Sequence, residues 1–273
     1  MSSENKLDEL HRVETELLAE TVKLFEKHDI KYYAIGGTLL GAIRHGGFIP
    51  WDDDIDLAVP REEYVRLIEI MRHEENPIVG MKYYRDEPQL YYYPMRLVHK
   101  GYITDDPRDV TGKCNPWIDV FPIDGWTEGK IGGRIFKAKM MTYRLLLALH
   151  YSDNLRDIKR SKIERIIIKT AQITHIGKLI NPTKVKDKID KTLSANKISK
   201  CHIVGTCMGA YFFHEFVPRS YFGEGTTVTF EGIEVKAPVK VHKYLTHMYG
   251  NYMELPPEDK RIIHVSGEIT KVE

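Results

Sequence analysis

A run of aspartates that passes directly into an apolar strand constrains the fold more than any other feature of the sequence. Aspartate occupies four of the five positions from 52 to 56, and only apolar residues follow from 57 to 59. Successive side chains on a strand point to opposite faces, so Asp54 and Asp56 share one face while Ile55 and Leu57 face the other. The sequence therefore predicts a strand that is anchored in a core by one face and presents two carboxylates on the other.

Two carboxylates this close cannot both remain ionised in a dry site without a counter-charge. A hard divalent cation supplies it, and proteins hold Mg²⁺ with one or two carboxylates together with phosphate oxygens. A third acid, Asp119, stands between apolar residues in WIDVFPID on a later predicted strand. We therefore expect Asp54, Asp56 and Asp119 to bind Mg²⁺, or Mn²⁺ in its place. Asp52 and Asp53 precede the strand, and the sequence leaves open whether they shape the turn or bind metal through water.

Two glycines precede the acid run, at the junction between a predicted strand and a predicted helix. KYYAIGG, residues 31–37, favours a short strand, and TLLGAIRH, residues 38–45, favours a short helix. Backbone N–H groups and the helix dipole can receive a phosphate at such a junction. Gly36, Gly37 and Thr38 are therefore candidates for phosphate binding.

The hydrophobic pattern along the chain alternates between helical and strand periodicity, which predicts a mixed α/β (α+β) fold. The expected helices cover residues 7–28, 38–45, 61–73 and 241–253. The expected strands cover residues 31–37, 54–59, 81–84, 91–100 and 117–123, with a hairpin at 226–239. A stretch of helical periodicity at about 129–200 lies between these parts, so we expect one domain over residues 1–273 with a helical insertion.

The charge of the chain is concentrated in that helical stretch. Residues 130–200 contain 18 Lys and Arg against 5 Asp and Glu, a balance of +13, although the net charge of the whole chain is only +1. An ordinary solvated basic face is one interpretation. The other is a surface for an anionic polymer or for the anionic membrane face, with exposed lysines such as Lys159, Lys162 and Lys186. We expect no nucleic acid partner, because no nucleic-acid-binding motif accompanies the charge.

The termini and cysteines indicate the compartment. The N-terminus is polar and lacks the apolar core of a signal peptide, and the longest apolar runs are too short to span a bilayer. We therefore expect a soluble, cytoplasmic protein, with a peripheral contact at the inner face of the membrane as an option. Cys114, Cys201 and Cys207 are expected to be reduced thiols. A zinc site that uses Cys201, Cys207 and a histidine is an alternative that the spacing supports poorly.

The ordered set of motifs resembles the nucleotidyltransferase (polymerase-beta-like) superfamily, in which three carboxylates from adjacent strands hold two metals. At the residue level, GTLLGAIRHGGFIPWDDDIDL at 37–57 resembles the signature block of the LicD family. Two further blocks match, at residues 114–125 and 230–261, so the resemblance covers most of the chain. Members of this family transfer phosphocholine from CDP-choline to cell-surface glycans, and the relatives fukutin and fukutin-related protein transfer ribitol phosphate from a CDP donor.

The resemblance implies a mechanism for this chain. Asp54 and Asp56 would bind Mg²⁺ at the donor pyrophosphate, and Asp119 would complete the metal site and orient or deprotonate the acceptor hydroxyl. Attack on the phosphorus that bears choline would expel CMP. The expected acceptor is a glycan or teichoic acid precursor, free or lipid-linked. The alternatives are a nucleotidyltransferase that uses a nucleoside triphosphate, and a glycan- or nucleotide-binding module without turnover.

Further residues are candidates for contact with such a donor. Besides the two glycines and Thr38, the candidate phosphate ligands are Arg44, His45 and Arg96. Aromatic rings can hold a quaternary ammonium group such as that of choline. The candidates for this cage are Trp51, Tyr91, Tyr93 and Trp117. Tyrosines on a strand also pack in cores, so the sequence leaves both roles open for them.

Overall fold

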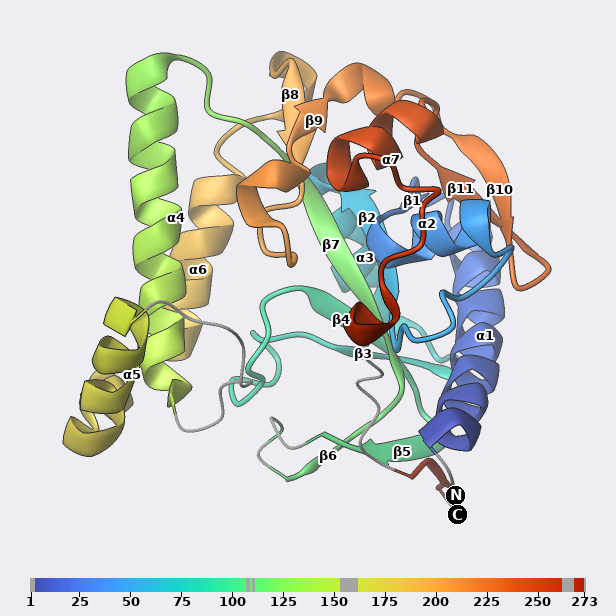
Figure 1. The fold of residues 1–273 in the computed structure, drawn as a ribbon, viewed down its shortest axis with the longest axis horizontal. Helices are drawn as coiled ribbons and strands as arrows, with labels where there is room; N and C mark the ends of the chain where they lie inside the picture. The colour runs from blue at the N-terminus through green and yellow to red at the C-terminus, as the bar shows by residue number, and fades with distance from the viewer. Residues whose placement is uncertain (1–2, 107–108, 110, 153–161, 262–267, 273) are drawn as a thin grey trace.

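A mixed β-sheet forms the centre of the fold in the computed structural model, which describes residues 3–106, 109, 111–152, 162–261 and 268–272 (Figure 1). The five strands along its main path are, in spatial order, β1 (Tyr33–Ala34), β2 (Ile55–Pro60), β7 (Trp117–Gly125), β4 (Met95–His99) and β3 (Val79–Lys82). At the far end of β7 the sheet continues through β8 (Ile203–Gly205) and β9 (Val217–Pro218). β2 and β7 are parallel, whereas the other pairs are antiparallel, which confirms the predicted mixed α/β fold.

The parallel pair of β2 and β7 determines the geometry of the acid residues. Its register places Asp56 opposite Asp119 and Leu57 opposite Val120. Ile55 and Leu57 of β2 are fully buried, as the alternating pattern predicts. A fully buried aliphatic side chain contributes about 1.5–3 kcal/mol relative to an exposed one, so a slip of one residue in this register would be strongly disfavoured.

Helices pack against the sheet and against one another. They are α1 (Ser3–Lys27), α2 (Gly36–Arg44), α3 (Arg61–His73) and α7 (Val241–Tyr249). α1 packs on β3, β4 and β7, and α3 packs on β2, β3 and β7. An apolar stripe along α1, which includes Leu10, Val13, Leu17 and Leu18, is buried. The hairpin of β10 (Thr226–Phe230) and β11 (Ile233–Ala237) is also confirmed, and it packs beside α2 and β1.

Some predicted boundaries were wrong. The strand expected at 31–37 is limited to β1, because Gly36 has φ +56° and turns the chain into α2. The strand expected at 91–100 begins only at Met95, after Pro94, which has no N–H to donate to a ladder. The helix expected to reach residue 253 ends at Tyr249, where Gly250 has φ +67°.

Smaller elements complete the described part of the chain. β12 (Thr270–Lys271), β5 (Tyr102–Asp105) and β6 (Lys113–Cys114) form a separate three-stranded sheet. The 3₁₀ turns are η2 (Ile176–Leu179), η3 (Ile198–Lys200), η4 (Phe212–Glu215), η5 (Arg219–Tyr221) and η6 (Glu258–Lys260). Cys114, Cys201 and Cys207 form no disulfide, as predicted, and all three are buried. No helix in the described ranges is long and apolar enough to cross a membrane.

The basic stretch is helical, as predicted, and lies at the opposite side of the molecule from α1 (Figure 1). Its helices are α4 (Lys130–His150), α5 (Lys162–Thr174) and α6 (Pro182–Leu193). Arg61 connects it to the sheet, because the guanidinium pairs with Asp124 on β7 at 2.5 Å and with Asp190 on α6 at 2.8 Å.

The expectation that Lys186 is exposed was wrong. Its side chain is buried, and its ammonium donates to the carbonyl of Leu90 and, at 3.2 Å, to the hydroxyl of Tyr151. Burial lowers the pKa of Lys186 to about 8. Lys159 and the side chain of Lys162 lie outside the described residues.

Candidate active site

A cavity of about 940 Å³ opens where β2 and β7 begin. Its lining comes from the start of α2, the acid run, the loop before β4, and the segments around η4 and α7. This volume is in the range of cavities that hold a nucleotide-sized ligand. The acid cluster is therefore part of a pocket and not of a solvated loop.

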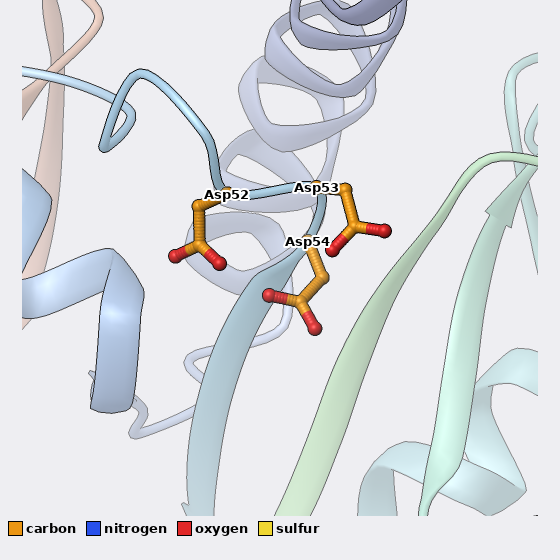
Figure 2. A group of neighbouring side chains, drawn as sticks. All are labelled: Asp52, Asp53 and Asp54. Carbon is orange, nitrogen blue, oxygen red and sulfur yellow. The ribbon is translucent and has the colours of Figure 1, made fainter. Parts of the chain in front are cut away.

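The three predicted metal ligands meet in this cavity. Asp54, Asp56 and Asp119 each offer a carboxylate oxygen, and these oxygens lie within 4.8 Å of one another. The parallel register brings two of them together, and Asp54 stands immediately before β2. A second group with the same spacing consists of Asp52, Asp53 and Asp54. Figure 2 shows these three carboxylates gathered around the start of β2.

The electrostatics of the cluster favour a cation. Burial raises the pKa of Asp54 and Asp56 well above the ordinary value, and the neighbouring aspartates raise it further. Burial and then the charge of Asp53 raise the pKa of Asp52 to about 6. When ionised, these carboxylates repel one another, and Arg96 offsets only part of that repulsion at Asp54. Because all of the ligand atoms are carboxylate oxygens, the site fits a hard divalent cation such as Mg²⁺.

The two glycines permit the close approach of the acids. A Cβ atom on Gly36 would lie 2.8 Å from Oδ2 of Asp56, and one on Gly37 would overlap the carboxylate of Asp52. Both glycines line the cavity at the start of α2, whose N-cap residue Ile35 provides no side-chain cap. The hydroxyl of Tyr244 hydrogen-bonds to the backbone of Gly36, and the phosphate contact expected of the two glycines remains a prediction.

Thr38 does not line the cavity and instead contacts the start of β2. It is buried, and its hydroxyl accepts a hydrogen bond of 2.8 Å from the backbone N–H of Asp56. This bond fixes the start of β2 against α2. Thr38 therefore positions an acid, and its predicted phosphate contact remains a prediction.

Arg96 is fixed next to Asp119. Its Nε donates to Oδ1 of Asp119 at 2.8 Å, and Nε1 of Trp117 donates to Oδ2 at 3.1 Å. The guanidinium carbon lies 3.8 Å from the ring centre of Tyr92 and 4.1 Å from that of Trp117. Arg96 therefore places a permanent positive charge at the cavity wall, with both carboxylate oxygens of Asp119 held in a fixed orientation.

The four residues proposed for a choline cage are divided among three arginines of the chain. Tyr91 and Trp117 lie around Arg96, whose carbon is 5.6 Å from the ring centre of Tyr91. The hydroxyl of Tyr93 bonds to Asp190 and lies 3.3 Å from a guanidinium nitrogen of Arg61. The ring centre of Trp51 lies 5.3 Å from the guanidinium carbon of Arg261. A shared cage for choline remains a prediction, and Tyr92 of the same aromatic block also packs on Arg96.

Arg44 and His45 lie at the end of α2. Arg44 lines the cavity, and its guanidinium donates to the carbonyl of Tyr252 at 2.9 Å and to Nε2 of His45 at 3.0 Å. Arg44 thus holds the segment after α7 against α2. His45 is not among the residues that line the cavity.

Two further buried acids escaped the sequence analysis. Glu14 on α1 is fully buried, and neither of its carboxylate oxygens has a hydrogen-bond partner. Burial, and then the negative charge of Asp54, raise the pKa of Glu14. Glu215 lines the cavity and accepts hydrogen bonds from the backbone N–H groups of Tyr211 and Phe212 at 2.8 and 3.1 Å. A signal for Glu14 was present, because it lies four residues after Leu10 on the apolar stripe of α1. No comparable pattern marks Glu215.

Comparison with known proteins defines the class to which this fold and site belong. Residues 29–124 match the family model described as LicD/FKTN/FKRP, nucleotidyltransferase domain. The matched region contains both glycines, the whole acid run and Asp119. The protein is an enzyme, a phosphotransferase built on a nucleotidyltransferase-type domain.

The chain belongs to the LicD family. It is 30% identical over 248 residues to the lipopolysaccharide cholinephosphotransferase LicD of Haemophilus influenzae, and the match covers 88% of this chain and 89% of that protein. It is also 48% identical over 42 residues to the ribitol 5-phosphate transferase FKRP of mouse and of human. That second similarity covers 15% of this chain and 8% of FKRP, so it is limited to a short segment.

Proposed function

We propose that the enzyme transfers phosphocholine, or a similar phospho-substituent, from a CDP-linked donor to a hydroxyl group of a cell-surface glycan, and releases CMP. The observation that carries the proposal is the meeting of Asp54, Asp56 and Asp119 in one nucleotide-sized cavity. The similarity to a lipopolysaccharide cholinephosphotransferase along most of the chain supports phosphocholine as the group transferred. CDP-choline is therefore the donor to test first.

The acids would hold Mg²⁺, or Mn²⁺, which neutralises charge on the pyrophosphate oxygens of the donor when it is bound. The backbone at Gly36 and Gly37 would receive one donor phosphate at the start of α2. Asp119, oriented by Arg96 and Trp117, would direct the acceptor hydroxyl and take its proton. A bond then forms between the acceptor oxygen and the phosphorus that bears choline, and the bond from that phosphorus to CMP breaks, with the electron pair leaving on CMP.

The acceptor class follows from the relative. The Haemophilus influenzae protein is described as acting on lipopolysaccharide, so we propose an envelope glycan as the acceptor here. A teichoic acid precursor, free or lipid-linked, offers the same chemistry of sugar or polyol hydroxyls beside phosphate groups. These two acceptor types are separable by assay.

The test follows the products of the reaction. Purified protein with Mg²⁺ and CDP-choline should release CMP only when lipopolysaccharide or lipoteichoic acid that lacks phosphocholine is added. CDP-ribitol in place of CDP-choline tests the head group. Release of pyrophosphate from a nucleoside triphosphate would instead identify a nucleotidyltransferase, and absence of both products with every donor would identify a binding module.

Variants of the acid cluster connect the activity to the site. Asp54→Asn and Asp56→Asn should abolish CMP release, because an amide is a much weaker ligand for a hard cation. The matched control is Asp105→Asn, which alters an exposed aspartate on β5. Near-normal Mg²⁺-dependent turnover in either cluster variant would contradict the proposed site.

A further inference from the structure

The exposed side of α4 carries large apolar residues that are not needed for packing against the rest of the protein. The residues of α4 that are buried against the rest of the protein are Gly133, Phe136, Met140 and Leu147. The large apolar residues that remain exposed on this helix are Ile131, Ile135, Met141 and Leu145, with exposed fractions of 75%, 52%, 56% and 46%. At about 100° per residue, the exposed residues fall in a stripe about 120° wide on the side opposite the buried ones.

Neighbouring elements extend the exposed apolar surface. η2 packs on the C-terminal end of α4, where Nδ1 of His150 lies 3.0 Å from the carbonyl oxygen of Gly177. Ile176 and Leu179 of η2 are 54% and 86% exposed, and Ile173 at the end of α5 is 71% exposed. We call these three residues, together with the four of the α4 stripe, the apolar face of the helical segment.

Basic residues accompany the apolar face, and Glu164 is the single acid in the sequences of α4, α5 and η2. The exposed basic side chains of α4, α5 and η2 are Lys130, Arg134, Lys137, Lys139, Arg144, Arg165, Lys169 and Lys178. The sequence contains no Asp or Glu at 130–152 or at 165–186. In a solvated face that only supports solubility, charges of both signs are usually interspersed.

We propose that the apolar face docks the enzyme on an anionic lipid bilayer. Large apolar side chains on a helix surface enter the boundary between headgroups and acyl chains, and basic side chains beside them reach the lipid phosphates. A symmetric contact with a second copy of the chain would place the two basic surfaces against each other, so charge disfavours that occupant. The proposal uses no residue of the acid cluster and stands independently of the reaction.

The experiment is co-sedimentation of the full chain with vesicles of phosphatidylglycerol and phosphatidylcholine. Binding should rise with the phosphatidylglycerol fraction and fall as salt is added. The double variant Ile135→Ser with Leu145→Ser should bind at least about tenfold more weakly, because it removes two inserting side chains. Arg134→Gln and Lys139→Gln should each weaken binding about fivefold, since one basic group near such a surface contributes about 1 kcal/mol.

Matched control variants distinguish binding through the apolar face from nonspecific adsorption to vesicles. Val65→Ser removes an apolar side chain on α3 that is 58% exposed, and Lys23→Gln removes an exposed positive charge on α1. Both control variants should bind vesicles like the parent, and melting curves should show that all variants are folded. Equal loss in the control variants, or binding unchanged by the stripe variants, would overturn the proposal. A concentration-dependent dimer that the stripe variants dissociate would overturn it as well, because the face would then bind a second copy.

Discussion

Replacing Asp52 by asparagine should stabilise the metal-free protein at neutral pH. The Asp52 carboxylate lies at the cavity among other acids, and burial followed by repulsion from Asp53 raises its pKa from 3.8 to about 6. Between about pH 4 and pH 6, the folded chain therefore retains a proton that the unfolded chain has released. A state that binds more protons loses stability as pH rises, so this carboxyl destabilises the fold increasingly across that interval.

The size of the effect follows from the same values. The full difference in pKa corresponds to about 3 kcal/mol at neutral pH. Asp52 is partly exposed, so solvent screening reduces this to about 1–2 kcal/mol. For a chain of this size, such a gain raises the melting temperature by about 2–8 °C. Asparagine is nearly isosteric with aspartate and carries no charge, so it should remove the penalty without a cavity.

The measurement is thermal denaturation of the parent and of Asp52→Asn in a chelating buffer. The melting temperatures are compared at about pH 7.5 and about pH 4.5. The variant should melt higher at the neutral pH, and the gain should vanish at the acidic pH. With saturating Mg²⁺ the difference in melting temperature between variant and parent should shrink or change sign, because the bound cation stabilises the parent more. Asp105→Asn is the control for charge removal alone. A variant that melts lower than the parent at neutral pH without metal would refute the electrostatic reasoning.

Three other variants test neighbouring parts of the site. Gly37→Ala should weaken Mg²⁺ binding about tenfold in calorimetric titration, because the new Cβ displaces the Asp52 carboxylate; unchanged affinity would show that Asp52 does not support the metal. Arg96→Lys should lower kcat about tenfold or more with little change in donor KM, because lysine cannot hydrogen-bond to Asp119 and also stack flat on Tyr92 and Trp117. A change in KM alone would assign Arg96 to donor binding. Asp124→Asn should lower the free energy of unfolding by about 3 kcal/mol in urea titration, because it leaves Arg61 buried with one carboxylate fewer; a loss below about 1 kcal/mol would show that Asp190 alone suffices.

The sequence was informative where a single strand determines the chemistry. Alternation along residues 54–59 indicated both the buried face of β2 and the shared face of Asp54 and Asp56. Asp119 was identifiable because an acid between apolar residues on a strand has to be accounted for. The strand pairing that sets Asp56 opposite Asp119 depends on contacts 63 positions apart in the sequence, which periodicity does not encode.

Side-chain partners were much harder to infer. Arg96 was chosen as a phosphate ligand, but it contacts Asp119 and Trp117 on β7 and Tyr92 in the loop before β4, a combination that only the folded chain brings together. Lys186 was expected to be exposed because lysine usually is, and its burial depends on the carbonyl of Leu90. Glu215 is buried because the backbone of η4 folds around its carboxylate, and local turns of that kind leave no periodic signal.

Arg61 couples the unfolding of the helical segment to the unfolding of the sheet. Its guanidinium is shared between Asp124 on β7 and Asp190 on α6, and all three side chains are largely shielded from water. Detachment of α6, and of α4 which packs on it, would break the Arg61–Asp190 pair in a poorly solvated place and expose core residues of these helices such as Phe136 and Ile189. A partly unfolded state with a melted helical segment and an intact sheet should therefore be too costly to accumulate. In calorimetry the two parts should melt in one transition, with a van't Hoff enthalpy equal to the measured heat.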